Sequence, residues 1–148
     1  MDHNSHTTPP LKLKAIDSED LTIISSLLQD ALIPISGMRY EKEKNQFYLV
    51  ANRFCWECAH HHEKDGTAFH RVQSGTLFDY VKNVQKQGLA THPETLVNLL
   101  TIHNTKDGCV HLVFSEGGQI KLEIEKLSCK LEDLEETYTT PSHPAHGI

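Results

Sequence analysis

Two thiols and two imidazoles stand close together in the middle of the chain, where Cys55 and Cys58 have Cys-x-x-Cys spacing and His60 and His62 follow. Thiolate sulfur and imidazole nitrogen are ligands that zinc prefers, and four such groups could make a tetrahedral site. Structural zinc sites usually join two separated ligand pairs, because the metal then ties distant parts of the chain together. Here all four groups share one short segment. We therefore expect a strand end followed by a polar loop, and zinc binding is the alternative hypothesis.

The remaining cysteines give little support to a larger metal site or a redox centre. Cys109 and Cys129 could complete a ligand set, but Cys129 is in phase with Leu127 and Leu131, which is typical of a buried small hydrophobic residue. Redox use of the Cys-x-x-Cys pair would require a helix N-terminus after a strand of a βαβ unit. The pattern around this pair predicts no such unit.

Other catalytic templates are absent from the sequence. It contains no Gly-x-Ser-x-Gly elbow, no glycine-rich phosphate loop with Lys-Ser or Lys-Thr, and no His-Glu-x-x-His motif. Asp17, Glu19 and Asp20 could be paired catalytic carboxylates, but we interpret them as anions that complement the positive end of a helix dipole. Arg53 and Asp79 lie in strand-like runs, where we expect structural partners across a sheet. The sequence predicts no catalytic residue and favours a protein that is not an enzyme.

An alternating pattern near the C-terminal end predicts the clearest structural element, a β-hairpin with one buried face. Its two apolar sets are Val110, Leu112 and Phe114, and then Ile120, Leu122 and Ile124. A three-residue loop of Glu116, Gly117 and Gly118 keeps both sets on one face and places Phe114 opposite Ile120. Such a loop needs a residue at positive φ, which glycine adopts without strain.

One amphipathic helix is predicted near the N-terminus. Asp17 can cap it, and Pro34 is expected to end it. Its apolar stripe comprises Leu21, Ile24, Leu27, Leu28, Ala31 and Leu32.

Everything after the helix has the pattern of strands. A hairpin of residues 38–42 and 47–56 would turn at Lys44 and Asn45 and place Tyr40 opposite Leu49 and Met38 opposite Ala51. Residues 68–72, 77–84 and 96–103 are predicted as further strands. After Ile124 the alternation slips, which indicates either a β-bulge or a helical turn over residues 127–134.

These elements predict an α+β fold, with one N-terminal amphipathic helix on a mostly antiparallel sheet of about seven strands. A strongly twisted meander of that size resembles a pleckstrin-homology-like barrel. We expect a single domain over residues 11–138, with disordered tails at residues 1–10 and 139–148, because both ends are rich in His, Thr, Ser and Pro. The 148-residue length suits one domain.

Charge and hydropathy argue against nucleic acid and membranes as partners. The net charge of -6 argues against a broad nucleic-acid surface, which requires cations to neutralise phosphates. No apolar run approaches the ~20 residues that span a bilayer, and the N-terminus has no signal-peptide core. We therefore expect a cytoplasmic protein with no membrane contact. Its four cysteines would then be reduced thiols.

Seven segments of the chain form a distinctive set. They are Leu11-Lys-Leu-Lys-Ala-Ile-Asp-Ser-Glu-Asp-Leu, Leu28-Gln-Asp-Ala, Asn52-Arg-Phe before Trp56-Glu57, Leu77-Phe-Asp-Tyr-Val, Leu99-Leu-Thr-Ile, the hairpin of residues 114–122, and Leu131-Glu-Asp-Leu. Together they resemble a bacterial, alphaproteobacterial family known as domain-of-unknown-function family 2948. The resemblance covers residues 11–146. It implies no assigned activity, so no site residue is carried over.

Taken together, these features favour a non-enzymatic cytoplasmic module that binds an unidentified protein or peptide, with sheet edges that could accept a partner strand. A metal-binding protein that uses residues 55–62 is one alternative. A small-molecule pocket between the helix and the sheet is another. No cofactor is expected, apart from zinc under the first alternative.

Overall fold

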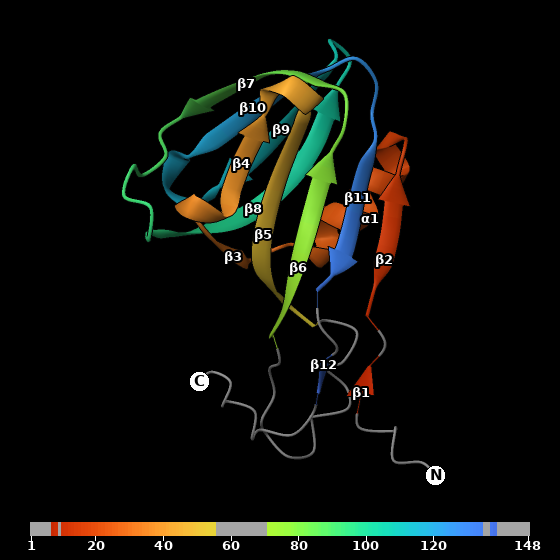
Figure 1. The fold of residues 1–148 in the computed structure, drawn as a ribbon, viewed down its shortest axis with the longest axis vertical. Coiled ribbons are helices and arrows are strands. Elements are labelled where there is room, and N and C mark those ends of the chain that lie inside the picture. The colour runs from red at the N-terminus through yellow and green to blue at the C-terminus, as the bar shows by residue number, and fades with distance from the viewer. Residues whose placement is uncertain (1–6, 9, 56–70, 135–136, 139–148) are drawn as a thin grey trace.

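The computed structural model describes residues 7–8, 10–55, 71–134 and 137–138 (Figure 1). In this part of the chain one helix accompanies a ten-stranded antiparallel sheet, so the fold is α+β. The helix is α1 (Ser18–Leu27), and the short 3-10 turns are η2 (Ile35–Gly37), η3 (Lys42–Lys44) and η6 (Ser115–Gly117). The strands are β1 (Thr7–Thr8), β2 (Lys12–Ala15), β3 (Ala31–Pro34), β4 (Met38–Glu41), β5 (Gln46–Phe54), β6 (Arg71–Phe78), β7 (Val81–Gln87), β8 (Leu96–Thr105), β9 (Cys109–Phe114), β10 (Gln119–Ile124), β11 (Cys129–Asp133) and β12 (Thr137–Tyr138).

The large sheet is open. Its strand order is β2-β11-β6-β5-β3-β8-β9-β10-β7, with β4 added beside β5, while β1 and β12 form a separate pair. The expected pleckstrin-homology-like barrel is therefore not formed, and about seven strands was too few. The edge strands β2 and β7 do not pair with each other, and α1 packs against β2 and β8. None of the described helices is long and apolar enough to cross a membrane.

Alternation along the strands produces the core. In β5 every second residue from Phe47 is buried, and the same period runs through β9 and β10. We call the face that carries these buried residues the inner face. Its largest members include Phe47, Phe78, Phe114, Leu49, Leu112 and Ile120, all with at most 1% of their surface exposed.

Helix α1 begins as predicted but ends earlier. Asp17 lies in the extended region, and its carboxylate accepts a hydrogen bond from the Asp20 backbone N–H at 2.8 Å. The helix stops at Leu27 rather than near Pro34, so the inclusion of Ala31 and Leu32 in the helical stripe was wrong. Asp30 takes a left-handed conformation there, and the next four residues form β3, which pairs with β8.

The predicted hairpin of β9 and β10 is present, with the correct faces but a different register. Val110 pairs with Leu122 and Leu112 with Ile120, so the pairing is displaced by two residues from the expected one. The three-residue loop comprises Ser115, Glu116 and Gly117, because Phe114 N–H donates to the Gly118 carbonyl. Both Glu116 and Gly117 have positive φ.

The hairpin of β4 and β5 shows the same displacement. Met38 pairs with Leu49 and Tyr40 with Phe47, because η3 and the left-handed Asn45 place the loop at residues 42–45, one residue earlier than the predicted strand bounds imply. The predicted strand of residues 77–84 is interrupted between β6 and β7 by Tyr80, whose φ is 61°. The described part of the predicted strand at residues 68–72 belongs to β6, and β8 confirms the prediction for residues 96–103.

The segment after Ile124 is neither a bulge in β10 nor a helix. β10 ends at Ile124, and the chain turns over to form β11, which pairs with β6 and β2 at the other side of the sheet. Cys129 and Leu131 are fully buried there. The prediction that Cys129 acts as a buried hydrophobic residue is therefore confirmed.

Candidate functional site

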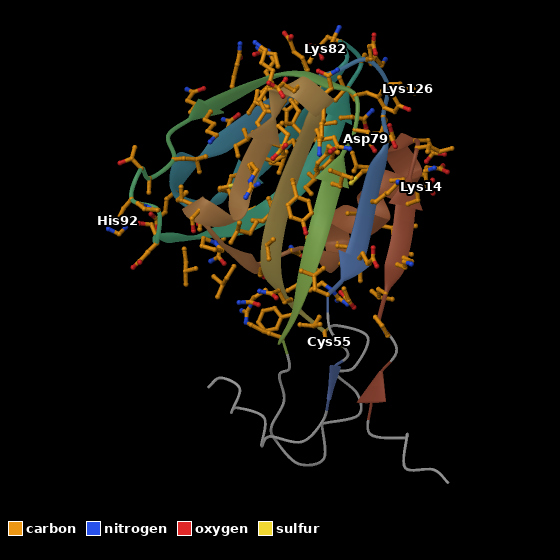
Figure 2. The ribbon with its side chains drawn as sticks, viewed as in Figure 1. Lys14, Cys55, Asp79, Lys82, His92 and Lys126 are labelled. Carbon is orange, nitrogen blue, oxygen red and sulfur yellow. The ribbon has the colours of Figure 1, made fainter. Side chains whose placement is uncertain are left out.

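Of the four candidate metal ligands, only Cys55 lies in the described part of the chain. It follows the end of β5 at the opposite end of the sheet from Asp79 and Lys126 (Figure 2), and it is buried and disulfide-bonded. The expectation of four reduced thiols is therefore wrong for Cys55, whereas Cys109 and Cys129 are free. A sulfur held in a disulfide has no thiolate to give to a metal.

The other candidates, Cys58, His60 and His62, lie outside the described residues, so the zinc hypothesis stays a prediction. Among the residues that are described, no group of three or more His, Cys, Asp or Glu side chains is arranged to hold a metal ion.

The two polar residues expected to have structural partners both have them. Arg53 is fully buried and forms a two-pronged ion pair with Asp133, from Nε to Oδ1 at 3.0 Å and from a terminal nitrogen to Oδ2 at 2.8 Å. Leu11 N–H donates to the same carboxylate at 2.9 Å. Asp79 accepts a hydrogen bond from Gln46 Nε2 at 2.9 Å. Both residues thus hold strands together.

Four neighbouring strands carry a row of polar side chains on the face opposite the core, which we call the outer face. His103 on β8 pairs directly with His111 on β9, His111 with Lys121 on β10, and Lys121 with Gln85 on β7. We name these four residues the outer row. The two imidazole rings are stacked, with centroids 5.2 Å apart and planes 10° from parallel.

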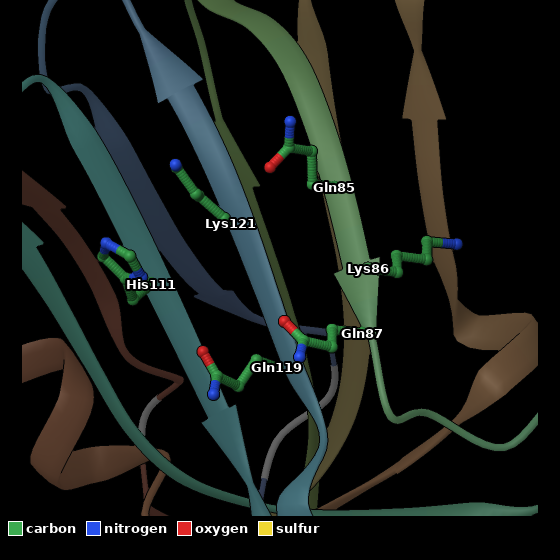
Figure 3. Close-up of a pocket in the computed structure, with 6 residues that line it drawn as sticks. All are labelled: Gln85, Lys86, Gln87, His111, Gln119 and Lys121. Atoms are coloured by element: carbon green, nitrogen blue, oxygen red, sulfur yellow. The ribbon is translucent and has the colours of Figure 1, made fainter.

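The next residues along these strands deepen the surface into a hollow of about 470 Å³. Gln119 pairs directly with Gln87, beside the outer row. The hollow is lined by Gln85, Lys86, Gln87, His111, Gln119 and Lys121 (Figure 3). The side chain of Lys86 points away from the other five, so it forms a rim rather than a floor. No carboxylate is among these lining residues.

Two carboxylates lie at the edge of this surface. Asp107, in the turn between β8 and β9, accepts a hydrogen bond from Thr105, which lowers the pKa of the Asp107 carboxyl, and Lys121 and His111 lower it further. Glu123 is two residues beyond Lys121 on β10, paired with Cys109. Burial, followed by the charge of Asp107, raises the pKa of the Cys109 thiol. Cys109 is thus poorly suited to act as a nucleophile at neutral pH.

The side chains of the hollow can form hydrogen bonds and ion pairs with a polar ligand. Side-chain amides both donate and accept hydrogen bonds, and Lys121 and the imidazoles can supply positive charge. Lys121 stands between the predicted buried residues Ile120 and Leu122 and so belongs to the opposite face of the hairpin, but the sequence singled out neither His103 nor His111. They could have been found only with the correct register of β9 and β10, because that register places His111 opposite Lys121.

Comparisons with known proteins identify a family but no described relative. No curated protein and no solved structure matches the chain. A family model described as a protein of unknown function, DUF2948, matches residues 11–146, which is most of the chain and the extent expected from the sequence. This chain therefore belongs to the DUF2948 family of proteins of unknown function.

Proposed function

We propose that this protein is a non-enzymatic module that binds an extended segment of a partner protein on the outer face of β7, β9 and β10. The observation that carries the proposal is the hollow of about 470 Å³, whose floor is made of three glutamine amides, one imidazole and one ammonium group. Surface glutamines that face each other across strands can bind the N–H and C=O groups of a peptide backbone together.

The character of the hollow favours a peptide over a buried small molecule. Small-molecule sites are mostly apolar and enclose their ligand, whereas this surface is polar and lies on the open side of a sheet. An extended peptide needs only a shallow polar track with a few side-chain contacts. Gln85 and Gln87 are alternate residues of β7, and Gln119 on β10 pairs with Gln87, so the three amides lie side by side on one face.

The edge of the sheet is a less favourable place for the partner than its face. β7 lies at the end of the strand order, and its exposed residues include Lys82 and Lys86. Lysines on an edge strand oppose pairing with a further strand. At the start of β7, Val81 N–H donates to the Asn45 carbonyl and Tyr40 Oη donates to the Val81 carbonyl, so part of this edge is already occupied.

A cross-linking experiment tests this proposal. A photo-reactive residue replaces Gln87 in the full chain expressed in its own cells, and cross-linked proteins are identified by mass spectrometry. We expect one reproducible partner, whose yield falls at least about fivefold when Lys121→Glu is added, since that change reverses the charge of the floor.

Lys130→Glu is the matched control, because Lys130 is an exposed lysine on β11, away from the hollow. It should leave the cross-linking yield unchanged. Equal yields with Lys121→Glu and Lys130→Glu would contradict the proposal, as would the lack of any reproducible partner for a chain that is monomeric in solution.

A further inference from the structure

Resting on the proposed function, we propose that the outer row recognises carboxylates, so that the partner segment is acidic and its binding takes up protons at His103 and His111. The three residues that can carry positive charge stand on adjacent strands in direct register. Neighbouring strands are about 4.8 Å apart, so the row from His103 to Lys121 spans roughly 10 Å. That span fits two carboxylates of one extended segment.

The stacked imidazoles provide the coupling between protons and ligand. With ring centroids 5.2 Å apart, two protonated rings repel each other, and Lys121 beside His111 adds to the repulsion. A carboxylate bound over the row offsets this repulsion. Affinity for an acidic segment should therefore rise as the pH falls through the range in which imidazoles in general take up protons.

The charged groups around the row set the size of this effect. Asp107 and Glu123 are anions at its border and compete with a ligand for the cations. On β7 the residues opposite Glu123 and Lys121 are the uncharged Asn83 and Gln85, and the charged Lys86 lies at the rim of the hollow. Asp107 already accepts a hydrogen bond from Thr105, so one of its lone pairs is engaged.

An acidic peptide fits this surface better than other anions do. The chain as a whole carries a net charge of -6, which opposes a polyanion that needs a broad cationic surface, such as duplex nucleic acid. A single phosphate would use the cations but leave the Gln119–Gln87 pair without a role. A peptide uses both, because its acidic side chains reach the row while its backbone amides reach the glutamines.

The test uses an end-blocked hexapeptide of alternating glutamate and serine as probe, with the glutamine-serine peptide as its uncharged match. Binding to the full chain is measured by fluorescence anisotropy at pH 8.0 and pH 5.5. We expect the glutamate peptide to bind about fivefold more tightly at pH 5.5, because an exposed ion pair changes an equilibrium by a factor of about two to five. The glutamine peptide should show no such gain.

Two variants and one control locate the effect. The double variant His103→Asn with His111→Asn should reduce the pH effect to less than about 1.5-fold, since amides do not titrate. Lys121→Met should weaken binding at both pH values by about threefold. His92→Asn changes an exposed histidine outside the outer row and should behave as the unmodified chain.

The outcomes separate this inference from the proposed function. Equal binding of the two peptides, or a pH effect that survives in the double variant, would overturn the carboxylate site even if the partner still cross-links at Gln87. Inorganic phosphate that displaces the probe at equimolar concentration would overturn the peptide as ligand. A gain in affinity at pH 5.5 for the glutamate peptide alone supports the inference. If Lys121→Glu then leaves the cross-linking yield of the partner unchanged, only the proposed function is refuted.

Discussion

Arg53 reaches from β5 across β6 to Asp133 on β11, and both charges lie in the core. Changing Arg53→Met should lower the free energy of unfolding by about 3–5 kcal/mol, because the Asp133 carboxylate loses its counter-ion while it stays buried. Urea denaturation followed by circular dichroism measures the loss. A loss below about 1 kcal/mol would show that the pair contributes little.

The double variant Arg53→Met with Asp133→Leu should be more stable than Arg53→Met alone, since no unpaired charge remains. Arg39→Met is the control on the surface. The Arg39–Glu41 pair is 3.3 Å apart, and its side chains are 71% and 38% exposed. Removing it should therefore change stability by less than about 1 kcal/mol.

Cys129 links stability to alkaline pH. Burial raises the pKa of its thiol far above the usual range, whereas in the unfolded chain a thiol has a pKa near 8.5. The stabilising effect of Cys129 is therefore complete below about pH 8.5 and is lost as the pH rises further, because only the unfolded chain releases the proton. The expected slope is about 1.4 kcal/mol per pH unit. Urea denaturation at pH 7.5, 9.0 and 10.5 should show this slope to be shallower in Cys129→Ala, and equal slopes would contradict it.

The end of β7 and the loop of the β9–β10 hairpin touch through their backbones. Gly88 has a φ of +70°, and a Cβ placed on it would lie 2.7 Å from the Gly117 carbonyl oxygen. Gly88→Ala should cost about 2–4 kcal/mol, since it adds left-handed strain and a backbone clash. Gly117→Ala is the match, because its φ is +86° but its Cβ would meet nothing within 4 Å. It should cost only about 1 kcal/mol in the same thermal denaturation assay. Equal costs would show that the contact is easily relieved.

Sequence alternation predicts which face a strand residue occupies but not which residue it faces. In both hairpins the buried and exposed sets were predicted correctly, because a one-residue slip would exchange the faces and bury polar groups. A slip of two residues keeps the faces, so the apolar pattern cannot detect it. The loops determine the register. In these loops Glu116 and Asn45 take the left-handed conformation, which is uncommon for residues other than glycine and is therefore hard to predict from the sequence.

That two-residue uncertainty explains why the candidate site was missed. In the expected register Lys121 would face Val113, and the row of His103, His111 and Lys121 would not exist. In the observed register Lys121 faces His111. The Arg53–Asp133 pair was beyond sequence reasoning for a different reason. It joins residues 80 positions apart, and Asp133 fell in a segment whose structure was left open.

The molecule as a whole depends on a narrow junction between two halves of its sheet. β3 pairs with β8 over four residues but with β5 through Leu32 and Asn52 alone. Helix α1, which lies beside β2 in Figure 1, packs against both β2 and β8. The outer row and the hollow lie entirely on β7 to β10. Binding at the outer face should therefore tolerate changes at the junction that lower overall stability.

A substitution of Ser25 on α1 tests whether the packing of α1 on β8 affects stability without affecting binding. Its hydroxyl accepts a buried hydrogen bond from Ile102 N–H of β8 at 2.9 Å. Ser25→Ala removes this acceptor and should lower the free energy of unfolding by about 1–3 kcal/mol. Ser26→Ala is the control, since Ser26 is exposed and donates within the helix to the Ile23 carbonyl. It should change stability by less than about 0.5 kcal/mol. Hydrogen exchange should show faster exchange at Ile102 in Ser25→Ala only, while probe binding at the outer row stays the same. Loss of both stability and binding would mean that α1 positions the site as well as the junction.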